Sequence, residues 1–184
     1  TLTAADGAQH DGRAHEVSGA GNARIEFTGN NEVIETSDLF IWVSWLEVKG
    51  PGDNNNVTVK GQTGSDGLRV HHCILHNNHA HAGADQAGIA PGGSSTGPVV
   101  LYRNLVYGCG GSGIKTGNGA AGSVALLNTV YECNLVNSAF RGGLEPDDND
   151  YALTSNGSFD NLNEDIDDNL GTLSNNATSD GTAT

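Results

Sequence analysis

The sequence is poor in several residue types, and each shortage excludes a class of protein. Its 184 residues include no methionine, only four prolines and three cysteines, and 5% aromatic residues. Eight Lys and Arg oppose 22 Asp and Glu, so the formal net charge is −14. A field of that sign repels nucleic acids and anionic membranes, and we expect neither as a partner. Three cysteines without a CxxC motif exclude a disulfide framework and a zinc ribbon.

Long apolar runs are also missing, and the start of the chain carries no recognisable leader. No run approaches the roughly 18 apolar residues that a membrane-spanning helix needs. The sequence begins at Thr1 instead of Met, so we expect either that a leader has been removed or that this is a piece of a longer protein.

The abundant residues are those of tight turns. The sequence contains 27 glycines and 20 asparagines, both of which disfavour long helices. Hydrophobic residues make up 36%, which predicts a thin aliphatic core in one domain.

Four segments repeat one apolar pattern, at residues 41–48, 68–75, 99–106 and 123–130. Within each segment the core-type positions are spaced by two, three and two residues. Steps of two keep side chains on one face of a strand, and the step of three indicates a corner. The aligned columns are Ile41/Leu68/Val99/Ser123, Val43/Val70/Leu101/Ala125, Leu46/Cys73/Asn104/Asn128 and Val48/Leu75/Val106/Val130.

The repeats recur at intervals of 27, 31 and 24 residues, the length of one solenoid coil. We therefore predict an all-β, right-handed parallel β-helix of six or seven coils in a single domain, 1–184. Residues 1–22 would form an N-terminal cap, 23–137 the regular coils and 138–184 acidic, irregular coils. Residues 50–56, 79–97 and 142–150 are expected to be long loops that leave the solenoid. A β-sandwich is the alternative, although it has no reason to keep the columns in register.

Two further stretches carry a resemblance to a known group of proteins. Asn104-Leu-Val-Tyr-Gly-Cys109 and Asn128-Thr-Val-Tyr-Glu-Cys133, together with the columns, resemble coils of the pectate-lyase-like superfamily of parallel β-helices. The opening Ala5-Asp-Gly and the closing residues 175–182 are similar to β-helix proteins of bacteriophages and environmental microbes. The resemblance covers residues 20–180 and implies the fold. It does not imply one activity, because the superfamily includes lyases, hydrolases, adhesins and inert virion parts.

Two asparagines and two cysteines of the columns have predictable surroundings. Asn104 and Asn128 share the corner column, where stacked asparagines can hydrogen-bond one another and the turn backbone. Cys109 and Cys133 also share a column. Adjacent coils would place them within disulfide range, so they form either a disulfide or a stacked pair of free thiols.

Two clusters have the residue types of metal sites. His79, His81 and Asp85 follow a histidine-rich strand and could ligate a transition metal; the alternative is a polar loop. Asp147, Asp148, Asp150, Asp165 and Asp167 could supply oxygen ligands to Ca²⁺, although no EF-hand pattern is present. The alternative is a solvated acidic edge that needs no cofactor.

The outward-facing positions carry no paired carboxylates, and the calcium aspartates and catalytic arginine of pectate lyases have no counterpart. We therefore expect no catalytic residues and no enzyme activity. The expected carbohydrate or partner surface consists of Trp45, Tyr102, Arg103, Tyr107, Leu126, Leu127 and Tyr131.

These residues predict a structural or adhesive module on a virion or in the extracellular space, such as a capsid decoration or a tail-spike component. Its partners would be copies of itself in a trimer or lattice, other virion proteins, or a cell-surface polysaccharide. The alternative is a secreted polysaccharide-acting enzyme, either a lyase or a glycoside hydrolase, or a carbohydrate-binding module.

Overall fold

The computed structural model describes residues 2–3, 24–26, 32–36, 40–50, 58–61, 67–78, 87–91, 97–116, 122–135, 142–146, 151–162, 164–166 and 172–180. All regular structure in these ranges is β, in three sheets of seven, seven and six strands. Every strand pairing within the sheets is parallel, which excludes the β-sandwich. The chain is a parallel β-helix. The described residues include no helix that is long and apolar enough to cross a membrane.

Each full coil contributes one strand to each sheet, in the order A, B and C. Sheet A contains β1 (Leu2–Thr3), β4 (Trp42–Ser44), β7 (Arg69–His71), β10 (Val100–Tyr102), β13 (Ser123–Leu126), β16 (Tyr151–Thr154) and β19 (Thr172–Ser174). Sheet B contains β2 (Arg24–Glu26), β5 (Glu47–Lys49), β8 (Ile74–His76), β11 (Leu105–Tyr107), β14 (Thr129–Tyr131), β17 (Gly157–Phe159) and β20 (Ala177–Thr178). Sheet C contains β3 (Ile34–Thr36), β6 (Val59–Gly61), β9 (Ala87–Ala90), β12 (Ser112–Thr116), β15 (Gly142–Pro146) and β18 (Glu164–Ile166).

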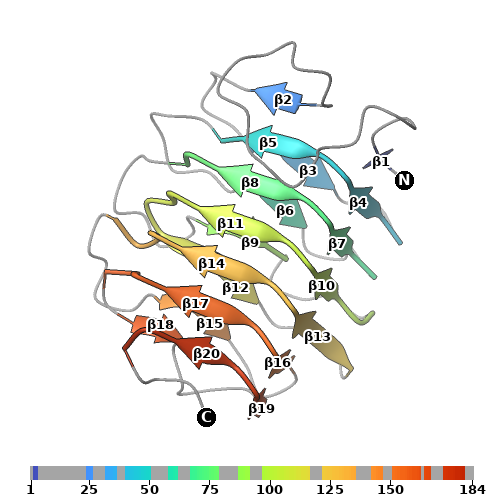
Figure 1. Ribbon diagram of the computed structural model, residues 1–184. Coiled ribbons are helices and arrows are strands. Elements are labelled where there is room, and N and C mark those ends of the chain that lie inside the picture. The colour runs from blue at the N-terminus through green and yellow to red at the C-terminus, as the bar shows by residue number, and fades with distance from the viewer. Residues whose placement is uncertain are drawn as a thin grey trace.

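The strands of sheet B descend as a staircase from β2 at one end of the molecule to β20 at the other (Figure 1). Sheet A follows the same order at its side. The N-terminus and the C-terminus lie toward opposite ends of the stack (Figure 1). The predicted interior pillar is confirmed, because Val43 pairs with Val70, Val70 with Leu101 and Leu101 with Ala125. All four side chains are fully buried.

A ladder of asparagine side chains fixes the corner between sheets A and B. The Nδ2 atom of Asn104 donates to Oδ1 of Asn128 at 3.0 Å, Asn128 repeats this with Asn156 at 3.0 Å, and Asn156 with Asn176 at 3.1 Å. In each pair, Oδ1 of the later asparagine also accepts the backbone N–H of the asparagine in the preceding coil. The predicted roles of Asn104 and Asn128 are confirmed, and the ladder extends through two asparagines that the sequence analysis did not place in it.

Each amide in the ladder joins three coils. Besides its bond to the next asparagine, Nδ2 of Asn104 donates to the Val70 carbonyl of the preceding coil at 2.8 Å, and Nδ2 of Asn128 donates to the Leu101 carbonyl at 3.0 Å. Both asparagines are at least 98% buried, with 2% and 1% exposed. A buried amide that satisfies its donors and acceptor stabilises the fold, whereas an unsatisfied one would be costly.

Sheet C was not predicted, and its strands correct part of the sequence analysis. Strand β9 lies within 79–97 and β15 lies within 142–150, both of which were expected to be loops. Glycine concealed these strands because it normally weakens a strand pattern. Here it is sterically required: a Cβ on Gly113 would lie 2.2 Å from Cγ1 of Val130 and 2.9 Å from the Gly143 carbonyl.

Removing one amide from the ladder should destabilise the whole solenoid. In Asn128→Ala, the buried N–H groups of Asn104 and the Leu101 carbonyl lose their partner, and we expect a loss of about 3 kcal/mol in the free energy of unfolding. Urea unfolding followed by circular dichroism measures it. Asn175→Gly is the control, because Asn175 is exposed with a φ of 54° and the change should cost less than about 1 kcal/mol. Equal losses in the two variants would contradict the role of the ladder.

Candidate functional site

The outer side of sheet A forms one continuous surface, which we call the sheet A face. Val43, Val70 and Leu101 point into the core, so their neighbours in the same strands point outward. The residue after each strand completes the face at the A–B corner. The sheet A face consists of Trp42, Ser44 and Trp45; Arg69, His71 and His72; Val100, Tyr102 and Arg103; Val124, Leu126 and Leu127; Ala152, Thr154 and Ser155; and Thr172, Ser174 and Asn175.

The corner residues of this face have a left-handed backbone conformation. The φ angles are 59° at Trp45, 53° at His72, 51° at Arg103 and 55° at Leu127. Such angles are uncommon for residues other than glycine, asparagine and aspartate. The asparagine ladder directly after the corner holds the chain in this conformation from Arg103 onward. As a result Arg103 and Leu127 project from the surface, and 42% of Leu127 is exposed.

The sheet A face contains no Asp or Glu, although the sequence has 22 of them. It contains two arginines, and within the described ranges neither forms an ion pair. The other described bases, Arg24, Lys49, Lys60 and Lys115, each pair with a glutamate. Among the described residues, Arg69 and Arg103 are therefore the two bases that have no carboxylate partner.

Both arginines lie over aromatic rings instead. The guanidinium carbon of Arg69 lies 5.0 Å from the ring centroid of Trp42, and that of Arg103 lies 4.9 Å from the centroid of Tyr102. A cation over a ring gains electrostatic attraction while the guanidinium N–H groups at its edge can still donate. Both guanidiniums are thus positioned without being neutralised.

The aromatic rings of the face cover one another. Trp45 and His72 stack at 4.4 Å with an interplanar angle of 13°, and His72 meets Tyr102 edge to face at 5.4 Å. Their stacking follows from the register of the coils. Because ring faces are already used in these contacts, the surface presents ring edges and guanidinium groups more than open ring faces. This arrangement does not favour the expected stacking of sugar rings on Tyr102.

His71 and His72 form a pair at the centre of the face. Their Nδ1 atoms lie 3.0 Å apart, so one ring must donate and the other must accept. Burial lowers the pKa of His71, and the Arg69 guanidinium lowers it further. His71 is therefore mainly neutral at pH 7, and Arg69 and Arg103 are the permanent charges of the face.

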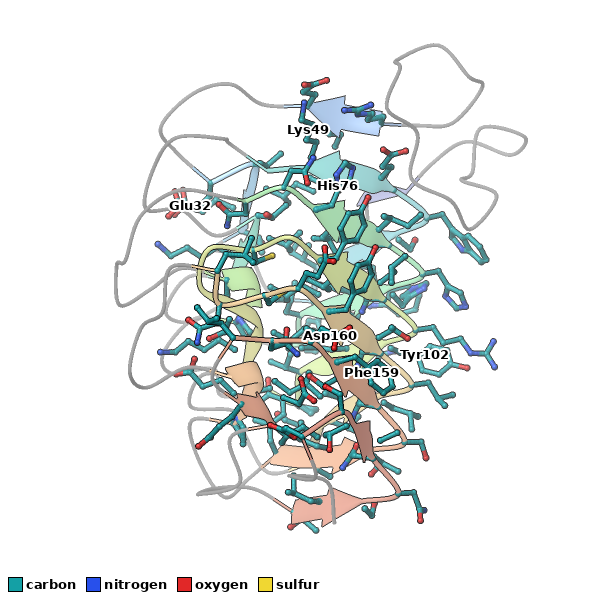
Figure 2. The ribbon with its side chains drawn as sticks, turned by 60° about the vertical axis from the view of Figure 1, so that its left-hand side comes forward. Glu32, Lys49, His76, Tyr102, Phe159 and Asp160 are labelled. Atoms are coloured by element: carbon teal, nitrogen blue, oxygen red, sulfur yellow. The ribbon has the colours of Figure 1, made fainter. Side chains whose placement is uncertain are left out.

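Tyr107 and Tyr131 belong to another surface, which corrects the single surface that the sequence predicted. They lie on sheet B and stack at 4.9 Å with an interplanar angle of 8°, and His76 continues the stack at 5.1 Å. Figure 2 shows Tyr102 at the side of the solenoid and His76 on the part turned toward the viewer. Burial and the nearby Glu132 raise the pKa of Tyr131.

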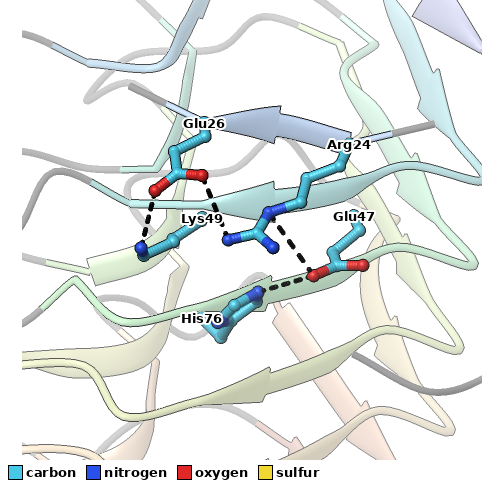
Figure 3. Close-up of polar contacts among 5 residues, drawn as sticks. All are labelled: Arg24, Glu26, Glu47, Lys49 and His76. Carbon is cyan, nitrogen blue, oxygen red and sulfur yellow. Dashed lines mark hydrogen bonds and ion pairs between the residues drawn. The ribbon is translucent and has the colours of Figure 1, made fainter. Parts of the chain in front are cut away.

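A buried charged cluster occupies the N-terminal end of sheet B (Figure 3). Glu47 is fully buried. Its Oε1 atom lies 3.0 Å from Nε2 of His76 and 3.7 Å from Nε of Arg24. Glu26 joins Arg24 to Lys49, with 2.6 Å between Oε1 and Nζ. His76 follows the buried Leu75 in β8 and points outward, yet only 4% of it is accessible. Burial lowers its pKa, and the hydrogen bond to Glu47 opposes that shift.

The structure leaves Cys109 and Cys133 as free thiols, both fully buried. The expected stacked pair of thiols is therefore present and the disulfide is not. The Cys133 thiol and burial together raise the pKa of Cys109 well above its usual value. Burial likewise raises the pKa of Cys73 to about 11, so neither group is a reactive thiolate at pH 7.

Asp165 is a structural carboxylate, which corrects its expected place among the Ca²⁺ ligands. It is 1% exposed, and Oδ1 accepts Nδ2 of Asn161 at 2.9 Å. Oδ2 accepts the backbone N–H of Ser179 at 2.6 Å and that of Asp180 at 3.0 Å. Both oxygens face donors, so this carboxylate fastens the last turn of chain to the stack.

The other expected metal ligands, His79, His81, Asp85, Asp147, Asp148, Asp150 and Asp167, lie outside the described residues. Within the described ranges no group of three or more His, Cys, Asp or Glu side chains could hold a metal ion.

The expected surface residues Trp45, Tyr102, Arg103, Leu126 and Leu127 do lie together on the sheet A face. Trp42 and Arg69 complete it, and the sequence analysis missed them. The alternation around Val43 and Val70 was the signal that could have identified them. Comparison of this chain with known protein families, with curated proteins and with solved structures found no match.

The lowered pKa values of His71 and His76 predict how stability depends on pH. Below the usual histidine pKa of 6.5 the unfolded chain takes up protons that the folded protein does not bind, so stability falls as the pH decreases. We expect the melting temperature to decrease between pH 8 and pH 5.5. The pKa values of Glu26 and Glu32 are lowered from 4.5, so these two carboxyl groups do not titrate between pH 8 and pH 5.5.

His76→Gln is the variant that assigns the effect. Glutamine keeps a donor for Glu47 but cannot titrate, so the pH slope should flatten. A slope that is absent in the wild type, or that is unchanged in the variant, would contradict the assignment to His76.

Asp165→Asn should loosen the C-terminal end of the solenoid. The amide replaces one accepting oxygen by a donor that faces other donors, and we expect a loss of about 3 kcal/mol in the free energy of unfolding. Urea unfolding measures this loss. The exposed neighbour Glu164→Gln is the control, with a change of less than about 0.5 kcal/mol. If both variants unfold like the wild type, Asp165 does not hold the end of the chain.

Proposed function

We propose that this chain is a structural β-helix module that assembles through the sheet A face. One observation carries the proposal: this face has tryptophan, tyrosine and arginine but no acidic residue, in a chain of net charge −14. Protein interfaces are enriched in Trp, Tyr and Arg and depleted of Asp, Glu and Lys. The composition of the face is therefore that of an interface.

The apolar side chains of the face support the same function. Trp42 is 41% exposed and Leu127 is 42% exposed, three coils apart on this face, and both would lose exposed apolar surface on docking. A stack of hydrogen-bonded coils is rigid, so the face keeps its shape on docking. A rigid, inert solenoid provides a surface rather than a reaction centre.

The setting that we propose is the surface of a virion or the extracellular space, with the module as a capsid decoration or tail-spike component. The resemblance of the coils to the pectate-lyase-like superfamily, as found in bacteriophages and environmental microbes, supports this setting. Partners would be further copies in a trimer or lattice, or other virion proteins.

A secreted polysaccharide-acting enzyme or carbohydrate-binding module is the second candidate. The uncompensated guanidiniums of Arg69 and Arg103 favour it, because they suit an acidic polysaccharide. Incubation with acidic polysaccharides, with unsaturated and reducing ends as the readout, distinguishes an enzyme. Turnover by the wild type that is abolished in His72→Ala and Arg103→Ala would contradict the structural proposal and indicate an enzyme.

Leu127→Asp should weaken assembly while leaving the fold intact. Aspartate tolerates the φ of 55° at this corner, but its charge would be buried against the partner. We expect the wild type to sediment as an oligomer in analytical ultracentrifugation and the variant to dissociate at least about 30-fold more readily.

Thr129→Asp is the matched control, because it adds the same charge in the same coil at an exposed position of sheet B. It should assemble like the wild type. A wild type that stays monomeric, or an assembly equally sensitive to both changes, would contradict the proposed role of the sheet A face.

A further inference from the structure

The identity of the docking partner can be inferred from charge, on the basis of the proposed function. We infer that the sheet A face docks onto the B–C corner of a second copy of this chain, in a head-to-tail contact. We call that corner the acidic ridge and define it as Glu132, Leu135, Asp160 and Leu162. The contact would pair the arginines of one copy with the carboxylates of the next.

The acidic ridge complements the sheet A face in both charge and apolar character. Glu132 and Asp160 are exposed, have φ angles of 49° and 55°, and occupy the same corner position in consecutive coils. Within the described part of the chain neither carboxylate forms an ion pair. Leu135 and Leu162 beside them are 44% and 54% exposed. The ridge therefore offers two anions and two leucines to two cations and an apolar surface.

A symmetric contact of the sheet A face with itself is electrostatically unfavourable. A two-fold dimer places the same patch on both copies, so Arg69 and Arg103 would meet only neutral residues or one another. Burying a guanidinium without a counter-ion is costly, and like charges across an interface repel. A favourable contact therefore joins the sheet A face to a different patch.

The two patches lie at neighbouring heights along the solenoid. Arg69 and Arg103 lie in consecutive coils, and Glu132 and Asp160 lie in the next two coils. One coil is a step of about 4.8 Å, which an extended arginine side chain spans, so Arg103 can reach Glu132 of a copy at the same height. A displacement of about two coils along the solenoid would pair both arginines with both carboxylates. Such a contact closes into a ring if the rotation permits, and otherwise continues as a filament.

Two charge-reversal variants test the inference by analytical ultracentrifugation. The face variant carries Arg69→Glu and Arg103→Glu, and the ridge variant carries Glu132→Arg and Asp160→Arg. Each should self-associate at least about 100-fold more weakly than the wild type. Arginine is compatible with these corners, since Arg103 itself has a φ of 51°.

Mixing the two variants separates a head-to-tail contact from a symmetric one. The face variant retains an intact ridge and the ridge variant an intact face, while the reversed face and the reversed ridge are complementary again. An equimolar mixture should therefore restore assembly to the size of the wild type, with the two variants alternating. A face-to-face contact would instead stop at a heterodimer, because the reversed face of one variant would pair only with the intact face of the other. A chain with all four substitutions should recover self-association, because the charges are exchanged. Lys60→Glu with Lys115→Glu is the control for net charge on another sheet, and melting curves verify that each variant folds.

The outcomes distinguish this inference from the proposed function. An assembly that depends on Leu127 but whose two charge variants do not pair overturns the head-to-tail contact and leaves the assembly function standing. A two-fold dimer held by the sheet A face overturns it as well. A wild type that stays monomeric overturns both, as does a monomer that binds polygalacturonate through Arg103.

Discussion

Every feature of this protein depends on the register between successive coils. Backbone hydrogen bonds between parallel strands repeat each coil directly above the last, so that a residue type repeated in sequence becomes a column in space. The columns are of three kinds: aliphatic pillars inside, an amide ladder at the A–B corner and rings or charges outside. A shift by one residue would exchange inside for outside and lose all three at once. The ladder opposes such a shift, because its amides fit only one alignment of the corner.

Sheets A and B could be predicted from the sequence because their core positions are aliphatic and regularly spaced. Sheet C could not, since its close approach to sheet B requires glycine at positions such as Gly88 and Gly113, and glycine is also the signature of a loop. The ladder was recognised only in part, because Asn156 and Asn176 lie in coils whose aliphatic pattern is weaker. An aliphatic pattern thus reveals a strand only where the packing leaves space for side chains larger than that of glycine.

The candidate site was partly predictable for a similar reason. Tyr102, Arg103 and Leu127 follow strong core positions, so the alternation places them outside. The burial of Glu47 and His76 could not be read from the sequence, because Glu47 takes its partners Arg24 and His76 from the coils on either side of its own. Neither could the lack of an ion pair at Arg69 and Arg103 within the described residues, which depends on where the acids of other coils lie. The spacing of residues predicts whether a side chain points inward or outward, whereas its ion pairs and its burial depend on the complete fold.

The left-handed corner between sheets A and B accepts Trp, His, Arg, Leu, Ser and Asn in six successive coils without a change in its backbone. Asparagines of the ladder follow this corner only from Arg103 onward, so the conformation depends neither on the displayed residue nor on the following amide alone. The corner therefore displays one side chain per coil, at intervals of about 4.8 Å, on a backbone that stays the same whichever residue is displayed. Single substitutions along this corner could change binding specificity while the backbone of the solenoid stays constant.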